Sequence, residues 1–220
     1  CEMAMLLSRF AIPCSSTRME AVNVSEASGP SLRAGRSPLA GLRAESIVAA
    51  GGALRAILIV ERPLATAIQV SARRGASARV AAAIKSALAV MPPDTPRMQR
   101  GEGVDALWSG PDQWMIMADA GRAAVVETML REAALGLASI VDQSHSRVQI
   151  GLSGARVRDV LAKLVTIDLY PSMFAEHDAA MTVLAHIPVQ IWRGRDADGV
   201  SVFEIAGPQS YAQSLWHHVV

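Results

Sequence analysis

Two short stretches of this chain hold the side chains best suited to binding or chemistry. In the first, Trp108-Ser-Gly-Pro-Asp112-Gln-Trp114, two indole rings flank a tight turn. The rings could wall a ligand site or serve as two core anchors around a hairpin. Only 4% of the chain is aromatic, and large rings dominate core burial, so core anchors are the favoured interpretation. Asp112 follows proline and is expected to accept backbone N–H bonds in the turn.

The second stretch, 141–147, contains Asp142, Ser144 and His145, the three residue types of a hydrolase triad. In an extended segment Asp142 and Ser144 point to one face and His145 to the other. Triad members normally converge from separate elements, whereas short polar residues before a strand more often satisfy their own backbone in a turn. The stretch therefore predicts a turn, and no catalytic residue is expected on this chain.

Motifs that hold nucleotides or metals are missing from the sequence. No Gly-x-Gly-x-x-Gly opens a helix, and no Gly-Lys-Ser/Thr phosphate loop occurs. His217 and His218 are adjacent, so on a helix they diverge and make a poor metal clamp. Because side chains cannot accept a hydride without a cofactor, the sequence argues against a stand-alone oxidase and predicts neither metal nor cofactor on this chain.

Composition excludes several kinds of protein. The chain has 220 residues, is 51% hydrophobic and carries a net charge of +1, which excludes a disordered polypeptide and gives no argument for nucleic acid. Its two cysteines, Cys1 and Cys14, cannot build a disulfide scaffold. No apolar run approaches the ~20 residues of a membrane span. The expected location is the cytoplasm.

Hydrophobic periodicity divides the chain into a tail and a folded part. Residues 1–36 have no apolar period and are expected to be a disordered or mis-started N-terminal tail, and 37–220 are expected to fold. Strands are expected at 53–60, 67–72, 105–109, 113–118, 139–141, 147–152, 180–185, 189–193 and 200–205. Helices are expected at 77–90, 122–134, 155–164 and 210–220.

This order of elements predicts the fold class. Runs of two or three strands between helices are typical of α+β proteins with mainly antiparallel sheets. We expect two packed split-βαβ, ferredoxin-like halves, about 37–136 and 137–220. In detail, Ser153 should cap the third helix. The helix residues expected to face inward include Val125, Val126, Met129, Leu130, Tyr211, Leu215 and Trp216.

Four blocks of the sequence carry a resemblance to a known family. Leu107–Met117 resembles the Leu-Trp-x-Gly-Pro-Asp-x-Trp block of the gamma subunit of heterotetrameric sarcosine oxidase. Residues 141–163 resemble that subunit's second block, 168–174 match the segment after it, and 37–40 match its usual opening. The blocks are specific in combination, and the resemblance covers about residues 37 to 220.

The resemblance implies a fold similar to the folate-binding domain of aminomethyltransferases. It implies a structural, non-flavin subunit in a complex with alpha, beta and delta subunits that oxidatively demethylates sarcosine to glycine and passes the one-carbon unit to tetrahydrofolate. FAD, FMN, NAD, zinc and tetrahydrofolate are expected on the partner subunits. A stand-alone folate-binding protein is the alternative, with Asp112 and Asp142 as candidates at the pterin. Candidates for structural or interface roles are Trp108, Trp114, His145 and Arg147.

Overall fold

The computed structural model describes residues 37–39, 42, 45–48, 55–62, 66–196 and 200–220. The tail expected at 1–36 lies outside the described residues, as does part of the connection between the strands expected at 189–193 and 200–205. All the described residues belong to one compact unit, Arg36–Val220.

Two antiparallel sheets form the framework. The six-stranded sheet has the order β1-β2-β8-β11-β10-β9, and the five-stranded sheet has the order β4-β5-β6-β3-β7. The six-stranded sheet comprises β1 (Glu45–Val48), β2 (Arg55–Glu61), β8 (Arg147–Ser153), β9 (Ala179–Leu184), β10 (Ile187–Arg193) and β11 (Val202–Pro208). The five-stranded sheet comprises β3 (Thr66–Ala72), β4 (Met98–Arg100), β5 (Val104–Gly110), β6 (Gln113–Ala118) and β7 (Ala138–Asp142). The predicted α+β class with mainly antiparallel sheets is confirmed.

The helices follow from apolar residues spaced four apart. Val80, Ile84 and Leu88 make the buried stripe of α2 (Ser77–Leu88). That helix ends where Ala89 turns left-handed at φ 56°, just before Pro92-Pro93, which could not continue it. The other helices are α3 (Ala123–Ala133), α4 (Val157–Leu164) and α5 (Ala212–Val219), which follows a 3-10 turn, η2 (Gln209–Tyr211).

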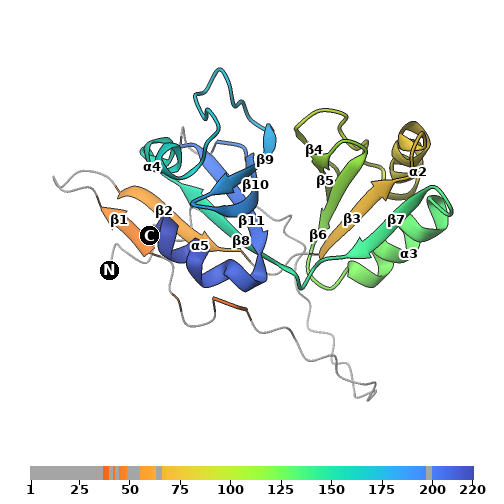
Figure 1. Cartoon of the computed structure of the whole chain (residues 1–220), viewed down its shortest axis with the longest axis horizontal. Coiled ribbons are helices and arrows are strands. Elements are labelled where there is room, and N and C mark those ends of the chain that lie inside the picture. The colour runs from red at the N-terminus through yellow and green to blue at the C-terminus, as the bar shows by residue number, and fades with distance from the viewer. Residues whose placement is uncertain (1–36, 40–41, 43–44, 49–54, 63–65, 197–199) are drawn as a thin grey trace, which may run out of the picture. The chain divides into compact units, whose positions relative to one another are not determined.

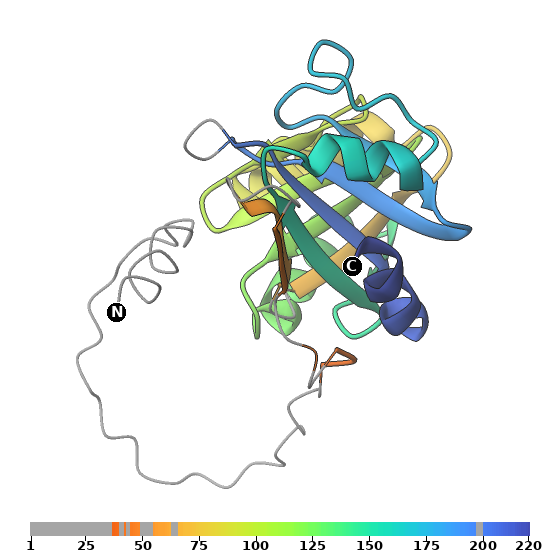
Figure 2. The same cartoon turned by 90° about the vertical axis from the view of Figure 1, so that its left-hand side faces the viewer.

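Each pair of helices covers one face of one sheet. α2 and α3 pack on the five-stranded sheet, and α4 and α5 pack on the six-stranded sheet (Figure 1). Figure 2 shows α4 and α5 lying across the face of the six-stranded sheet that is turned toward the viewer. The uncovered faces of the sheets meet in a small third apolar cluster, formed by Ala67, Met98, Leu107, Met115, Ala179, Trp192 and Ala206.

The chain crosses between the sheets twice. The first crossing leads from β2 to β3, and the second leads from β7 to β8 through residues 143–146. As a result β2 pairs with β8, and β7 pairs with β3. Each sheet therefore draws strands from both sides of residue 136, where the boundary between the two halves was expected.

Several details differ from the sequence expectations. Ser153 does not cap a helix, because it ends β8, and α4 begins after Arg156 without a side-chain cap. Val125 and Met129 are exposed, since α3 packs through a narrow stripe formed by Val126 and Leu130. Tyr211 is also exposed because it lies in the 3-10 turn before α5, while Leu215 and Trp216 are buried as expected. The short strands β1 and β4 were not predicted.

Candidate functional site

A segment just before β9 joins the two sheets through its backbone. The N–H of Met98 donates to the carbonyl of His177 at 2.7 Å, and the N–H of His177 donates to the carbonyl of Arg193 at 2.9 Å. Met98 begins β4 in one sheet and Arg193 ends β10 in the other. His177 itself has φ 67°, a left-handed conformation that is uncommon for residues other than glycine. The main chain of His177 is therefore held between the two sheets.

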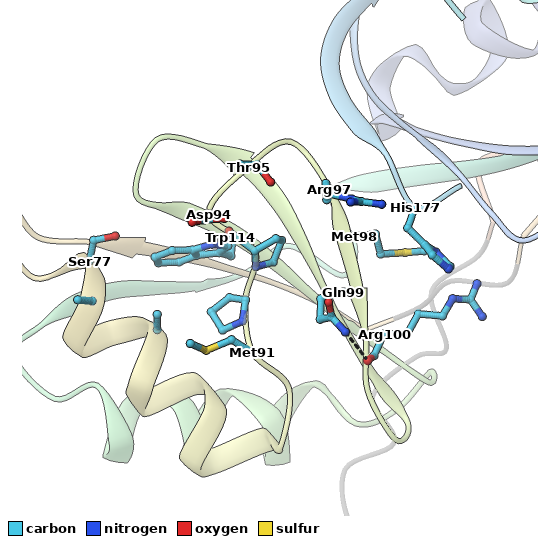
Figure 3. A pocket seen from close by; sticks show the side chains of 14 residues that line it. Ser77, Met91, Asp94, Thr95, Arg97, Met98, Gln99, Arg100, Trp114 and His177 are labelled. Atoms are coloured by element: carbon cyan, nitrogen blue, oxygen red, sulfur yellow. Dashed lines mark hydrogen bonds between the residues drawn. The ribbon is translucent and has the colours of Figure 1, made fainter. Parts of the chain in front are cut away.

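Beside this junction lies a cavity of about 780 Å³, which we call the β4 groove. Figure 3 shows its two parts: Trp114, Asp94 and Met91 on one side of β4, and Arg97, Arg100 and His177 on the other. The lining residues come from the start of α2, the segment 91–100, β6 and the junction: Ser77, Ala78, Ala81, Met91, Pro92, Pro93, Asp94, Thr95, Arg97, Met98, Gln99, Arg100, Trp114 and His177. The groove has the size of a typical ligand site, with an apolar wall and a cationic end.

Arginines dominate the charge of the β4 groove. Arg97 contacts Asp178 through Nε at 3.3 Å and donates from Nη2 to the Glu176 carbonyl at 3.2 Å. For the Arg100 guanidinium, the described residues provide no hydrogen-bond acceptor or ion pair. Asp94 is the one acidic side chain among the lining residues. The groove is therefore suited to a negatively charged ligand or partner.

Burial and charge also act on the titratable groups near the groove. Burial lowers the pKa of His177 below its usual value, and the nearby Arg100 and Arg97 lower it further, against the opposing effect of Glu176. Its Nδ1 is buried without a hydrogen-bond partner in the described part of the chain. Burial raises the pKa of Asp105, which faces Arg100 across the β4–β5 ladder.

A second polar cluster lies where the sheets face each other. Arg62 donates from Nε and Nη2 to Glu204 Oε1 at 2.9 and 2.6 Å, and Gln149 donates to Glu204 Oε2 at 3.2 Å. A Cβ at Gly151 would lie 2.6 Å from Arg62 Nε, so this glycine lets the guanidinium lie against β8. The Glu204 carboxylate is therefore buried and paired with Arg62.

The two tryptophans belong to the β5–β6 hairpin. Trp108 and Trp114 lie opposite each other in the β5–β6 ladder, so both rings are on one side of the hairpin. Trp114 is 4% exposed and donates from Nε1 to the Pro93 carbonyl at 2.7 Å. The Trp108 carbonyl accepts a 2.7 Å bond from Gln190 of the other sheet. Trp114 therefore anchors one core and also forms part of the groove wall.

The segment that resembled a hydrolase triad is a turn. Ser144 donates to Asp142 Oδ1 through both its N–H (2.8 Å) and its hydroxyl (2.6 Å), and the N–H of Ala67 donates to Ser144 Oγ at 3.0 Å. His145 is exposed in this turn. Arg147 donates from Nε to the Gln143 side chain at 3.0 Å, and burial lowers its pKa. Nucleophile and base do not meet here, in agreement with the predicted turn.

The two aspartates considered for folate lie near different ends of β3. Asp112 is in the β5–β6 turn at φ 59°, where its carbonyl accepts the N–H of Ala72. Asp142 pairs with Ile68, near the beginning of β3. Both are exposed, and neither lines the β4 groove. The structure does not gather them into a pterin site.

Sequence reasoning missed the residues of the β4 groove. Arg97 and Arg100 lie between the helix expected at 77–90 and the strand expected at 105–109, and His177 lies between the helix expected at 155–164 and the strand expected at 180–185. Their one sequence signal was the run of prolines at 92, 93 and 96, which fixes an extended backbone before β4.

Among the residues that the structure describes, no group of three or more His, Cys, Asp or Glu side chains is placed to hold a metal ion. None of the described helices combines the length and apolar character that crossing a membrane requires.

Two solved structures share the α+β fold of this chain. Glycine cleavage system aminomethyltransferase T from Bartonella henselae has a similar structure, with a TM-score of 0.53 over 73% of this chain and 44% of that chain, at 17% identity. A chain of heterotetrameric sarcosine oxidase from Corynebacterium sp. U-96, in complex with pyrrole 2-carboxylate, is more similar. Its TM-score is 0.72 at 27% identity, over 84% of this chain and 92% of that one.

Sequence comparison identifies the family of the chain. Sarcosine oxidase subunit gamma from Arthrobacter sp is 35% identical over 139 residues, which are 61% of this chain and 67% of the relative. This chain thus spans about two thirds of that relative's length. The model of the sarcosine oxidase gamma subunit family matches residues 73–220. The chain belongs to the sarcosine oxidase gamma subunit family, as the sequence blocks predicted.

Proposed function

We propose that this chain is the non-flavin gamma subunit of a heterotetrameric sarcosine oxidase and that its role is structural. The observation that carries the proposal is the structural match to a chain of such a complex, which covers 84% of this chain and 92% of that chain. Alpha, beta and delta subunits are its proposed partners. The complex would oxidatively demethylate sarcosine to glycine in the cytoplasm and pass the one-carbon unit to tetrahydrofolate.

The described residues support an arrangement in which the catalytic residues belong to other subunits of the complex. The Asp142–Ser144–His145 segment is a turn that bonds its own backbone. We place FAD, FMN, NAD, zinc and tetrahydrofolate on the partner subunits. Side chains alone cannot accept the hydride of an amine oxidation, so this chain would act by binding its neighbours.

Exposed apolar side chains also fit an assembly role. Leu135, Tyr170 and Met173 are 83%, 67% and 65% exposed. Large apolar side chains at a surface are what a subunit that buries part of that surface against neighbours presents when alone.

Co-expression tests this proposal. The alpha, beta and delta subunits are produced with and without this chain, purified through a tag on alpha, and assayed for oxygen consumption with sarcosine. With this chain present we expect a stable four-subunit complex that turns over. Without it, we expect poor assembly and low activity. Normal assembly and turnover without this chain would contradict the structural role.

A further inference from the structure

We propose that the β4 groove is a docking site for an extended, acidic segment of a neighbouring subunit. The inference rests on the proposed function and deepens it, because it names the surface and the chemistry of one contact. Three independent features of the groove support it: charge, an apolar wall and an exposed strand edge.

Charge complementarity favours an acidic segment. The Arg97 guanidinium pairs with Asp178 and donates to the Glu176 carbonyl. The described residues offer no such partner to the Arg100 guanidinium. The other end of the groove is formed by the first turn of α2, where Ser77 and Ala78 line the cavity. That turn has no acidic residue and no side-chain cap, so its N–H groups add positive potential. The end of the groove at Arg97 and Arg100 therefore favours carboxylates, whereas Asp94 lies on the side of Ser77 and Trp114 and offsets part of the positive potential of α2 there.

The wall between the two ends is apolar. Met91 is 51% exposed there, beside Pro92, Pro93 and the alanines of α2. An exposed methionine adapts its shape to a partner at little cost. A partner segment with apolar residues between its acidic ones would cover this wall.

The backbone of β4 offers hydrogen bonds to such a segment. The N–H of Trp108 donates to the Arg97 carbonyl and the N–H of Gly101 donates to the Val104 carbonyl. In an antiparallel ladder this alternation directs the main-chain groups of Arg100 away from β5. The junction segment uses the neighbouring N–H of Met98 but ends at His177. Beyond it, the outward-facing Arg100 carbonyl accepts one long, exposed bond from the neighbouring Gln99 Nε2, at 3.4 Å (Figure 3). A partner strand that adds to this edge of β4 would replace that single bond.

The site is also held in place before a partner binds. Backbone bonds from Met98 and Ala179, and the Arg97–Asp178 pair, fix β4 to the junction between the sheets. A preformed edge loses less conformational entropy on binding.

The test uses the complete complex. This chain is tagged and co-expressed with the alpha, beta and delta subunits, and the partners recovered with it are quantified. Arg100→Glu should reduce recovery roughly tenfold, because it opposes the acidic segment with a like charge, and Arg100→Lys should retain most of it. Lys163→Glu is the matched control, since it makes the same change of charge at an exposed position on α4 of the other sheet. Thermal unfolding of each isolated variant checks that it is folded.

Cross-linking identifies the occupant. A photo-reactive residue replaces Gln99, which lines the groove and is exposed, and mass spectrometry identifies the captured peptide. We expect a segment of one partner subunit that contains Asp or Glu. Normal recovery with Arg100→Glu, equal losses with Lys163→Glu, or capture of no acidic segment would each overturn the inference.

The two proposals fail in different ways. If the wild-type chain does not assemble with these subunits at all, the proposed function fails, and the inference fails with it. If the wild type and Arg100→Glu assemble equally, only the docking site is wrong. The groove could instead bind a small anion, for which benzoate is the probe. Benzoate would then raise the unfolding temperature of the isolated chain, Arg100→Glu would abolish that rise, and assembly of the complex would be unchanged. That result would also overturn the inference.

Discussion

The helix-covered faces of the two sheets are packed with aliphatic and aromatic side chains, whereas the faces between the sheets combine a small apolar cluster with charged and amide groups. Phe203 is fully buried beneath the helices of the six-stranded sheet, stacked at 6.2 Å on Phe174. On the opposite face of the same strand, the neighbouring Glu204 accepts bonds from Arg62 and Gln149. One strand thus serves both environments through the alternation of its side chains.

This difference indicates what each region does. The helix-covered cores supply most of the free energy of folding, because burial of apolar area is the dominant favourable contribution. The contact between the sheets is smaller and depends on directional bonds, such as the 2.7 Å bond from Gln190 to the Trp108 carbonyl. Directional bonds fix which groups meet, so this region sets the geometry of the junction and of the β4 groove.

The largest expected effect is in the helix-covered core. Phe203→Ala should lower the free energy of unfolding by about 3–5 kcal/mol, because it removes a fully buried ring and leaves a cavity. Leu107→Ala, in the cluster between the sheets, should cost about 2–3 kcal/mol, at the low end of the range for such changes, since fewer buried apolar neighbours surround it. Denaturant unfolding measures both. A larger loss for Leu107→Ala would reverse the comparison.

The buried carboxylate between the sheets should give an intermediate effect. Glu204→Gln removes the charge that Arg62 and Gln149 both bond, and should cost about 1–3 kcal/mol. Glu127→Gln breaks the Arg131–Glu127 pair on the surface of α3 and should cost about 0–1 kcal/mol. Urea unfolding of the wild type and the two variants measures both losses of unfolding free energy. Equal costs would mean that the Arg62–Glu204 pair behaves as a surface ion pair.

The smallest effect concerns the junction and depends on pH. Arg97, Arg100, Glu176 and Arg195 surround His177, whose pKa lies below the ordinary 6.5. Below pH 6.5 the unfolded chain therefore binds a proton that folded His177 resists, so stability falls as the pH drops from 6.5 through the folded pKa. His177→Asn removes the titration and keeps a side chain that tolerates positive φ.

Unfolding free energies of wild type and His177→Asn, measured between pH 7.5 and 5, test this sign. The advantage of the wild type over the variant should shrink as the pH falls. A constant or growing advantage would show that the histidine at the junction does not resist protonation.

The sequence was informative where local periodicity decides structure. The helical spacing of Val80, Ile84 and Leu88 predicted α2 and its buried face, and the short apolar run at 113–118 after the turn predicted β6. It failed where neighbours in space decide, because Val125 and Met129 fit an apolar helix face but α3 packs through a narrower stripe. The three-residue β4 is too short to show any period, and pairing with β5 and the junction defines it.

By itself, the sequence determined the α+β class, most of the strands and helices, the turn at Asp142–Ser144, and the family, through blocks such as Leu107–Met117. These depend on local periodicity, on turn chemistry and on linear motifs. Only the tertiary structure decided that Arg97, Arg100 and His177 line one groove with Trp114, and that Arg62 meets Glu204 142 residues away. Such contacts arise from the two crossings between the sheets, which bring together residues whose positions in the chain give no sign of their proximity.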